Sequence, residues 1–435
     1  MPRWSLAASA CLLTAITIPA GGQVPVAKDR AAAGASSPVQ AAPVDARLQG
    51  ALDLLRADNA WTVRQQRELC EIPAPPFKEE RRAAEYLRRM QALGLEHARI
   101  DKAGNAIAER PGTGGGPTVV VVGHLDTVFP ESTDVRVREQ EGRLHGPGIG
   151  DNCRGLAAIL AVARALDSAG VRTLGRLVFV GNVGEEGPGN LRGVRHLYDE
   201  ELAGKIDYFV AVDGAGLDLV TRAVGSKRYR VTFKGPGGHS FGAFGIPNPI
   251  HALGRAIATI GDLQVPSNPR TTFNVGVIGG GTSVNSIPFE AVADVDMRSE
   301  SPEALDALER QVVQAFRAAL DAENARWPGA RAHEAQLSLV MDTIGIRPAG
   351  TQPDDAPIVR AALDAARTLG FTPRTSASST DANVPLGRGL PGMSMDGGGR
   401  GSGAHSLDEW YEDGQRGWLG PQWIALTVTS LARVQ

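Results

Sequence analysis

The chain has 435 residues, which is more than one hydrophobic core usually supports, so the length predicts two domains. With 42% hydrophobic and 21% charged residues, the composition is typical of a globular protein. The net charge of −3 argues against a nucleic-acid-binding surface and against a polybasic patch that would bind a membrane.

Residues 1–22 have the pattern of a secretory signal peptide. Arg3 precedes an apolar stretch, and small residues follow within the expected cleavage region, residues 20–27. The stretch is too short and too weakly flanked for a membrane span, and a buried N-terminal helix is the alternative. Residues 23–45 are rich in Ala, Ser and Pro and are predicted to be a flexible spacer. We therefore expect an exported protein, periplasmic or secreted.

Cleavage of the signal peptide leaves two cysteines, Cys70 and Cys153. An exported protein can hold such a pair as a disulfide. The sequence does not give the distance between them, so their pairing stays open.

Residues 46–225 alternate between helix and strand patterns. Helical spacing of apolar residues predicts helices over 80–94 and 155–170, and each ends at a glycine. Continuous apolar runs predict buried strands over 117–123, 176–183 and 207–213. Buried strands separated by helices predict a sheet that helices cover on both faces, so we interpret residues 46–225 as the first part of an α/β catalytic domain.

The pattern changes over residues 226–342. Strands are predicted over 227–235, 271–280, 289–299 and 335–341, and helices over 249–261 and 301–325. The order strand, helix, two strands, helix, strand is that of a split βαβ, or ferredoxin-like, module. A further helix over 357–370 resumes the earlier pattern. Residues 226–342 are therefore predicted to be an inserted module, and residues 343–435 the second part of the catalytic domain.

Five polar residues directly follow predicted strands or lie in glycine-rich loops. Residues in such positions of an open α/β sheet meet outside the carboxyl ends of the strands. Singly, each also has an ordinary structural interpretation, such as a satisfied histidine or a helix cap. Together, two imidazoles and three carboxylates suit zinc or another first-row divalent ion, and the set is large enough for two ions. These residues are His124, Asp151, Glu186, Asp213 and His405.

Two adjacent glutamates, Glu185 and Glu186, follow the predicted strand 176–183. Neighbouring side chains in a strand or turn point apart, so one carboxylate can hold a cation while the other faces something beside it. A metal hydrolase needs one glutamate as ligand and another as base for water. The alternative is two solvated acids in a loop.

The motifs and their order, over about residues 55 to 430, resemble the family of di-zinc exopeptidases and amidohydrolases that includes peptidase T, carboxypeptidase G, acetylornithine deacetylase and the aminoacylases. The resemblance implies two divalent ions per chain, zinc first, with cobalt or manganese as alternatives. It implies that one ion is held by His124 and Asp213, the other by Glu186 and His405, and that Asp151 bridges both.

The resemblance also implies roles for residues beside the metals. Glu185 would be the general base that moves a proton from the bridging water to the leaving amine, and Asp126 would orient His124. A cis peptide bond is expected between Asp151 and Asn152.

For the inserted module, the resemblance implies a lid through which two subunits dimerise. His239, in "GPGGHSFG", would reach the active site of the partner subunit and stabilise the tetrahedral oxyanion, with an ordinary loop histidine as the alternative. Asn285 and Arg298 match positions that hold the carboxylate or carbonyl of the substrate, although Arg298 also reads as a surface charge. Asp381 and Asn383 match a block near the metals.

We therefore predict an exported, metal-dependent exopeptidase that hydrolyses amide bonds of short peptides. An N-acyl-amino-acid deacylase is the alternative, because both cleave an amide beside a carboxylate-bearing residue. A non-catalytic metal- or peptide-binding relative is a second alternative. Such a relative would be expected to lack the general base, whereas this chain has Glu185. No nucleic-acid partner and no stable membrane insertion are expected.

Overall fold

The structure is a computed structural model that describes residues 45–435. The predicted signal peptide and nearly all of the predicted spacer lie outside the described residues. Residues 45–435 belong to one compact unit. Within the described part of the chain, no helix is long and apolar enough to cross a membrane.

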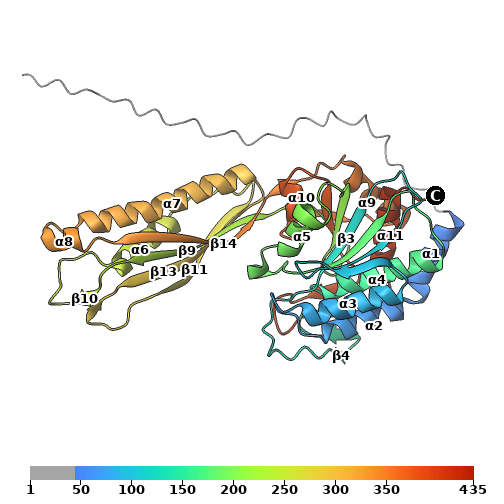
Figure 1. Ribbon diagram of the computed structural model, residues 1–435, viewed down its shortest axis with the longest axis horizontal. Helices are drawn as coiled ribbons and strands as arrows, with labels where there is room; N and C mark the ends of the chain where they lie inside the picture. Colours follow the sequence, from blue (N-terminus) through green and yellow to red (C-terminus); the bar gives the residue numbers. More distant parts are fainter. Residues whose placement is uncertain (1–44) are drawn as a thin grey trace, which may run out of the picture. The chain divides into compact units, whose positions relative to one another are not determined.

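A nine-stranded mixed sheet forms the centre of the catalytic part (Figure 1). Its order is β1-β2-β6-β3-β7-β17-β8-β15, and β16 pairs with β8. The strands are β1 (Glu96–Ile100), β2 (Ala106–Arg110), β3 (Val119–His124), β6 (Leu177–Asn182), β7 (Tyr208–Val212), β8 (Asp218–Ala223), β15 (Gly350–Thr351), β16 (Arg374–Ser378) and β17 (Gly392–Met395). Because β6, β3, β7 and β17 are parallel neighbours, their carboxyl ends lie at one edge of the sheet.

Helices cover both faces of this sheet, which confirms the prediction. Alternate residues of β3 enter different hydrophobic clusters, Val119 and Val121 on one face and Val120 and Val122 on the other. The first cluster is closed by α1 (Ala46–Ala57), α2 (Asn59–Cys70), α3 (Glu80–Ala92), α4 (Cys153–Ser168), α9 (Pro357–Thr368) and α11 (Leu419–Leu431). The second is closed by α5 (Arg192–His196), η2 (Leu197–Glu201) and α10 (Asn383–Gly387).

A second sheet belongs to the inserted module. Its four antiparallel strands are ordered β11-β13-β9-β14. They are β9 (Gly225–Lys234), β11 (Thr271–Gly280), β13 (Glu290–Ser299) and β14 (Ser338–Arg347), with helices α6 (Pro249–Gly261), α7 (Pro302–Ala325) and α8 (Ala330–Glu334) and the short strands β10 (Gly238–His239) and β12 (Ser286–Ile287). A hydrophobic cluster separate from that of the catalytic part holds α6 and α7 against the sheet. The chain order confirms the split βαβ prediction.

Strand β14 continues beyond residue 342, where the sequence places the end of the module. Its last residues still pair with β9, as Arg347 lies opposite Ser226. The extended strand brings Arg347 to the end of the module, within hydrogen-bond reach of Glu185.

A small third sheet joins two loops of the catalytic part. Its order is β18-β19-β5-β4. The strands are β4 (Arg138–Gln140), β5 (Arg143–His145), β18 (Arg400–Ser402) and β19 (Trp410–Glu412). Pairing of β19 with β5 places the segment around His405 beside the segment that leads to Asp151.

Candidate active site

The carboxyl edge of the central sheet gathers the predicted polar residues. Strand β3 ends at His124. The turn after β6 carries Glu185 and Glu186, and Asp213 directly follows β7. These strands are parallel neighbours, so residues far apart in the sequence come together here.

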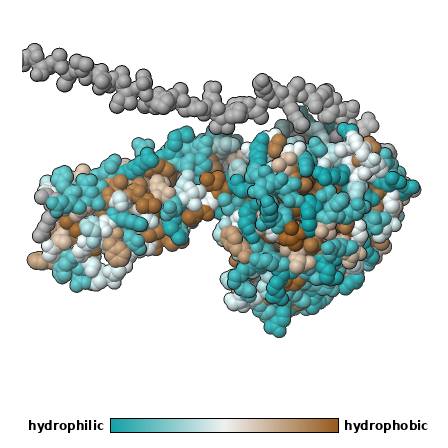
Figure 2. Space-filling model, viewed as in Figure 1, coloured by the Kyte–Doolittle hydropathy of each residue, from teal (hydrophilic) through white to brown (hydrophobic). Residues whose placement is uncertain are grey.

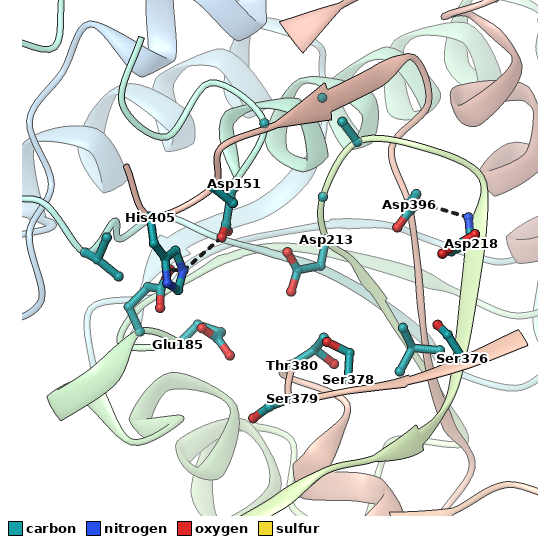
Figure 3. A pocket seen from close by; sticks show the side chains of 18 of the residues that line it. Asp151, Glu185, Asp213, Asp218, Ser376, Ser378, Ser379, Thr380, Asp396 and His405 are labelled. Carbon is teal, nitrogen blue, oxygen red and sulfur yellow. Dashed lines mark hydrogen bonds and ion pairs between the residues drawn. The ribbon is translucent and has the colours of Figure 1, made fainter. Parts of the chain in front are cut away.

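Asp151 lies between the two histidines. Its Oδ1 is 3.0 Å from Nε2 of His124, and its Oδ2 is 3.2 Å from Nε2 of His405. The His124 nitrogen is also 3.6 Å from Asp213 Oδ1, and the His405 nitrogen is 3.0 Å from Glu186 Oε1. Figure 3 shows Asp151 and His405 pointing toward each other at one end of a cavity. The Asp151 carboxylate therefore has one oxygen next to the pair His124 and Asp213 and the other next to the pair His405 and Glu186.

This donor set fits a pair of divalent cations. Ligand atoms of His124, Asp151 and Glu186 all lie within 4.8 Å of one another. Hydrogen bonds from the imidazole to the carboxylates of Asp151 and Glu186 raise the pKa of His405 to about 10, so the carboxylates favour positive charge at this position. Divalent metal cations would supply this positive charge, with the imidazole and carboxylate groups as their ligands.

The loop that carries Asp151 is anchored at the start of α4. The peptide bond between Asp151 and Asn152 is cis, as predicted. The Asn152 side chain accepts a hydrogen bond from the backbone N–H of Gly155 at 3.0 Å and caps the helix. Cys153 forms a disulfide with Cys70, with the two Cα atoms 5.5 Å apart. The pairing that the sequence left open is therefore formed.

Asp126 contacts its neighbours differently from the expectation. The His124 Nδ1 atom is 3.0 Å from the backbone carbonyl oxygen of Asp126 but 3.8 Å from the carboxylate. The carboxylate instead accepts the backbone N–H groups of Glu185 at 3.0 Å and Glu186 at 2.8 Å. The carbonyl of Asp126 therefore orients the imidazole, and its side chain holds the two glutamates in place.

Glu185 and Glu186 face different partners. Glu186 points to His405, whereas Glu185 Oε1 is 2.7 Å from Nη1 of Arg347. Arg347 also donates to the backbone carbonyl of Glu185 and, at 2.9 Å, to Ser379 Oγ. Glu185 is 4% exposed and Arg347 5%. Burial raises the pKa of Glu185 well above its ordinary value, and the Arg347 charge opposes this rise.

The sequence did not identify Arg347 or Glu409 as parts of the site. Arg347 is 162 residues from Glu185, and no local pattern links them. Glu409 is buried and accepts hydrogen bonds from the backbone of the loop that carries Asp151. For Arg347, the signal that could have indicated a role in the site is its position at the end of a strand. For Glu409, it is the short distance of four residues from the expected ligand His405.

Residues 381–383 make hydrogen bonds to the chain segments that lead into the site. Asp381 accepts a hydrogen bond from Asn182 Nδ2 at 2.8 Å, and burial raises the pKa of the Asp381 carboxyl to about 7. Asn383 donates to the backbone carbonyls of Val224 and Pro348, so it connects two chain segments.

A cavity of about 970 Å³ opens beside Asp151, Glu185 and His405. Its volume is in the range of small-molecule sites. Figure 3 shows hydroxyl side chains along one wall and an acidic pair at the far end, where Asp396 accepts the backbone N–H of Asp218. The hydroxyl residues are Ser376, Ser378, Ser379 and Thr380.

The three residues expected to bind substrate from the inserted module behave differently from one another. Arg298 lines the cavity and forms an ion pair with Asp296 at 2.7 Å. His239 is exposed on β10, and its Nδ1 accepts the backbone N–H of Phe241 at 3.3 Å. Asn285 is also exposed, beside Ser240. Neither His239 nor Asn285 is among the residues that line the cavity of this one chain.

Most of the chain matches the model of a known protein family. The model for peptidase family M20/M25/M40 matches residues 120–416. The chain belongs to this peptidase family. As an M20 member it is a metal-dependent hydrolase of the peptidase and amidohydrolase class.

Relatives within the M20 family are distant. A succinyl-diaminopimelate desuccinylase of Pseudomonas syringae pv. syringae is 28% identical over 51% of this chain and 63% of its own length. Carboxypeptidase G2 of a Pseudomonas species is 28% identical over 50% of this chain and 54% of its own length. The chain thus matches between half and two thirds of these two relatives. The aminopeptidase PepT structure from Bacillus cereus shares the fold, with a TM-score of 0.68 at 22% identity over 86% of this chain and 99% of that one.

Proposed function

We propose that this M20 hydrolase is an exported exopeptidase that cleaves amide bonds of short peptides, with two divalent ions, zinc first, held at the carboxyl edge of the central sheet. The observation that carries the proposal is the position of Asp151 between His124 and His405, with the buried carboxylate of Glu185 beside the same cavity. A lone structural histidine or a helix-capping acid does not need this arrangement.

His124 and Asp213 would hold one ion, Glu186 and His405 the other, and Asp151 would bridge them. Bound ions of this kind polarise a carbonyl group and lower the pKa of water, which makes hydroxide available near neutral pH. The geometric support is that each Asp151 oxygen lies within 3.2 Å of a different histidine nitrogen.

Glu185 would carry the proton. Its carboxylate takes a proton from the attacking water as the oxygen bonds to the amide carbon. It then returns the proton to the nitrogen as the C–N bond breaks, so the products are a carboxylate and an amine. The ion pair with Arg347 holds the carboxylate in one orientation and favours its ionised form.

The cavity supports a short and polar substrate. Arg298 on one side offers a planar cation for a carboxylate, and the acidic pair Asp218 and Asp396 lies at the other end. The likeness to the relative named carboxypeptidase G2 supports the proposal of a peptide-like substrate with a free carboxylate for this chain. The relative named succinyl-diaminopimelate desuccinylase supports the second candidate, an N-acyl-amino-acid deacylase.

A homodimer through the inserted module completes the proposal. Large apolar side chains are exposed there, with Phe241 at 89%, Phe244 at 73% and Val284 at 103% of full exposure. Figure 2 shows hydrophobic surface over this part of the molecule. Exposed apolar area of this kind is typical of protein interfaces. In a dimer, His239 would enter the cavity of the partner subunit and donate to the oxyanion.

Export is supported by two features. Residues 1–22 have the signal-peptide pattern. The buried disulfide between Cys70 and Cys153 suits an oxidising compartment.

The test is product analysis on a panel of substrates. Mature protein loaded with zinc is incubated with free dipeptides, free tripeptides and N-acylated amino acids, and the products are identified by mass. Release of single residues from free peptides supports the exopeptidase. Cleavage of N-acylated amino acids alone would replace it with the deacylase, and no cleavage of any substrate would overturn both.

A further inference from the structure

The carboxylate of Glu409 contacts the backbone of the loop that carries Asp151. Oε1 accepts the N–H groups of Gly150 at 2.8 Å and Asp151 at 2.9 Å, and Oε2 accepts the N–H of Gly148 at 2.6 Å. The backbone carbonyl of Glu409 accepts the N–H of Gly146 at 3.1 Å. One residue therefore makes four hydrogen bonds to a stretch of six residues that ends at Asp151.

Glu409 is 2% exposed. Among residues 45–435, no nitrogen of a lysine, arginine or histidine lies within 4.0 Å of it. A buried carboxylate without a cationic partner is costly, and the hydrogen bonds from the loop are its compensation. An apolar side chain of similar size would leave three backbone N–H groups without an acceptor, so the carboxylate does more than fill space.

The loop is shaped to receive this carboxylate. A Cβ atom on Gly150 would lie 3.3 Å from Glu409 Oε1, which is tight. Gly148 has φ of 80°, and a Cβ there would meet Thr127 Cγ2 at 2.7 Å. Glycine at position 150 thus allows the carboxylate to approach its three backbone donors, Gly148, Gly150 and Asp151.

Glu409 also connects two proposed ligands. It precedes β19 and follows His405 by four residues, whereas its hydrogen bonds go to the loop of Asp151. The carboxylate of Asp151 lies 3.2 Å from His405 Nε2. The contacts of Glu409 therefore fix the distance between the segments that carry these two residues.

We propose that Glu409 is a positioning residue for the metal centre: its carboxylate fixes the backbone of residues 148–151 so that Asp151 can bridge two ions. The inference rests on the proposed two-metal function and adds a residue to it. Glu409 lines the same cavity, but both oxygens of its carboxylate accept backbone N–H groups of the loop, so we place its action through the loop.

The variant that tests this role is Glu409→Gln. The amide keeps the size of the side chain but turns an N–H donor toward backbone N–H groups, so at least one hydrogen bond to the loop is lost. Loss of such a supporting contact typically weakens metal binding or activity by about 10- to 100-fold. We expect a Zn²⁺ affinity weaker by about 10- to 100-fold for one of the two ions, an altered absorption spectrum of the Co²⁺-loaded protein, and a lower kcat with little change in KM.

Glu412→Gln is the matched control. Glu412 lies three residues further along the chain, at the end of β19, and its carboxylate pairs with Arg400 at 2.7 Å and Arg143 at 3.2 Å on the surface. This variant has the same chemistry of substitution and should keep the Zn²⁺ affinity and the Co²⁺ spectrum of the wild type.

Circular dichroism of the chelated proteins shows whether Glu409→Gln folds. If it does not, Gly150→Ala replaces it, because the added methyl group displaces the Glu409 carboxylate without removing its charge. Weaker Zn²⁺ binding by Gly150→Ala supports the inference. Wild-type Zn²⁺ affinity for both ions in the folded variant would overturn it. The wild-type protein distinguishes this outcome from failure of the proposed function. If the wild type binds two Zn²⁺ ions, only the role of Glu409 is overturned. A wild type that does not bind two metal ions would overturn both the role of Glu409 and the proposed function.

Discussion

The contact between Arg347 and Glu185 sets how well the proposed base can work. Burial raises the pKa of Glu185 well above its ordinary value, and the Arg347 charge 2.7 Å away opposes the rise. A base acts in its ionised form, so a higher pKa leaves less of it ionised at neutral pH.

Replacement of this arginine should therefore move the pH profile. In Arg347→Gln the pKa of Glu185 rises further, the acidic limb of kcat/KM shifts to higher pH, and kcat at pH 7 falls by about tenfold or more. Rates measured from pH 5 to 9 check this. Arg388→Gln is the control, because Arg388 forms a surface ion pair with Asp199 at 2.7 Å and such pairs contribute little. An unchanged acidic limb in Arg347→Gln would contradict the role given to this ion pair.

At the scale of elements, the disulfide joins the last residue of α2 to the first residue of α4. The cysteines are 83 residues apart in sequence, and both are fully buried. A cross-link stabilises mainly by restricting the unfolded chain, by about 2–4 kcal/mol for a typical disulfide.

The double variant Cys70→Ala/Cys153→Ala should lose about 2–4 kcal/mol of unfolding free energy. Urea denaturation of the chelated protein measures the loss without a contribution from bound metal. Wild-type protein treated with a reductant should unfold at a similar urea concentration. Equal stability of the oxidised wild type and the double variant would show that the cross-link does not support the fold.

Elements with long periodic patterns were predictable. The helix Pro249–Gly261 and the strand Thr271–Gly280 have the bounds that the sequence predicts. Asn248 caps that helix and Pro249 occupies its first position, so the start is marked locally. Strands β5 and β19 have three residues each, too few for periodicity to show, and the sheet that they form was missed.

The site follows the same division. The five expected ligands each follow a strand or lie in a glycine-rich loop, so local sequence pointed to them. Glu409 stands in "SLDEWYED", where its sequence neighbours look like those of a solvated acid. Its partners are about 260 residues away in the chain, and only the pairing of β19 with β5 brings them together. Contacts made through tertiary structure leave no local signal.

Across the whole molecule, the proposed role of His239 calls for two subunits. His239 is exposed and does not line the cavity of its own chain. In the proposed dimer the oxyanion donor would come from a second copy, and a C2 dimer would exchange the two histidines.

Complementation tests this exchange. His239→Ala and Glu185→Ala should each be nearly inactive as pure proteins. After the subunits are mixed and allowed to exchange, half of the dimers are hybrids with one intact site, so about a quarter of wild-type activity should return. His239→Ala should still bind both ions. No recovery in a mixture shown to contain hybrid dimers would contradict the role of His239 across the interface.

Glu185 is proposed to act on water while its neighbours hold metal. The most direct measurement is kcat together with metal content for Glu185→Ala, on a substrate that the wild type cleaves. We expect two ions per chain in both proteins and a fall in kcat of about 10²- to 10⁴-fold in the variant. A variant that keeps both ions and the wild-type kcat would contradict this role of Glu185.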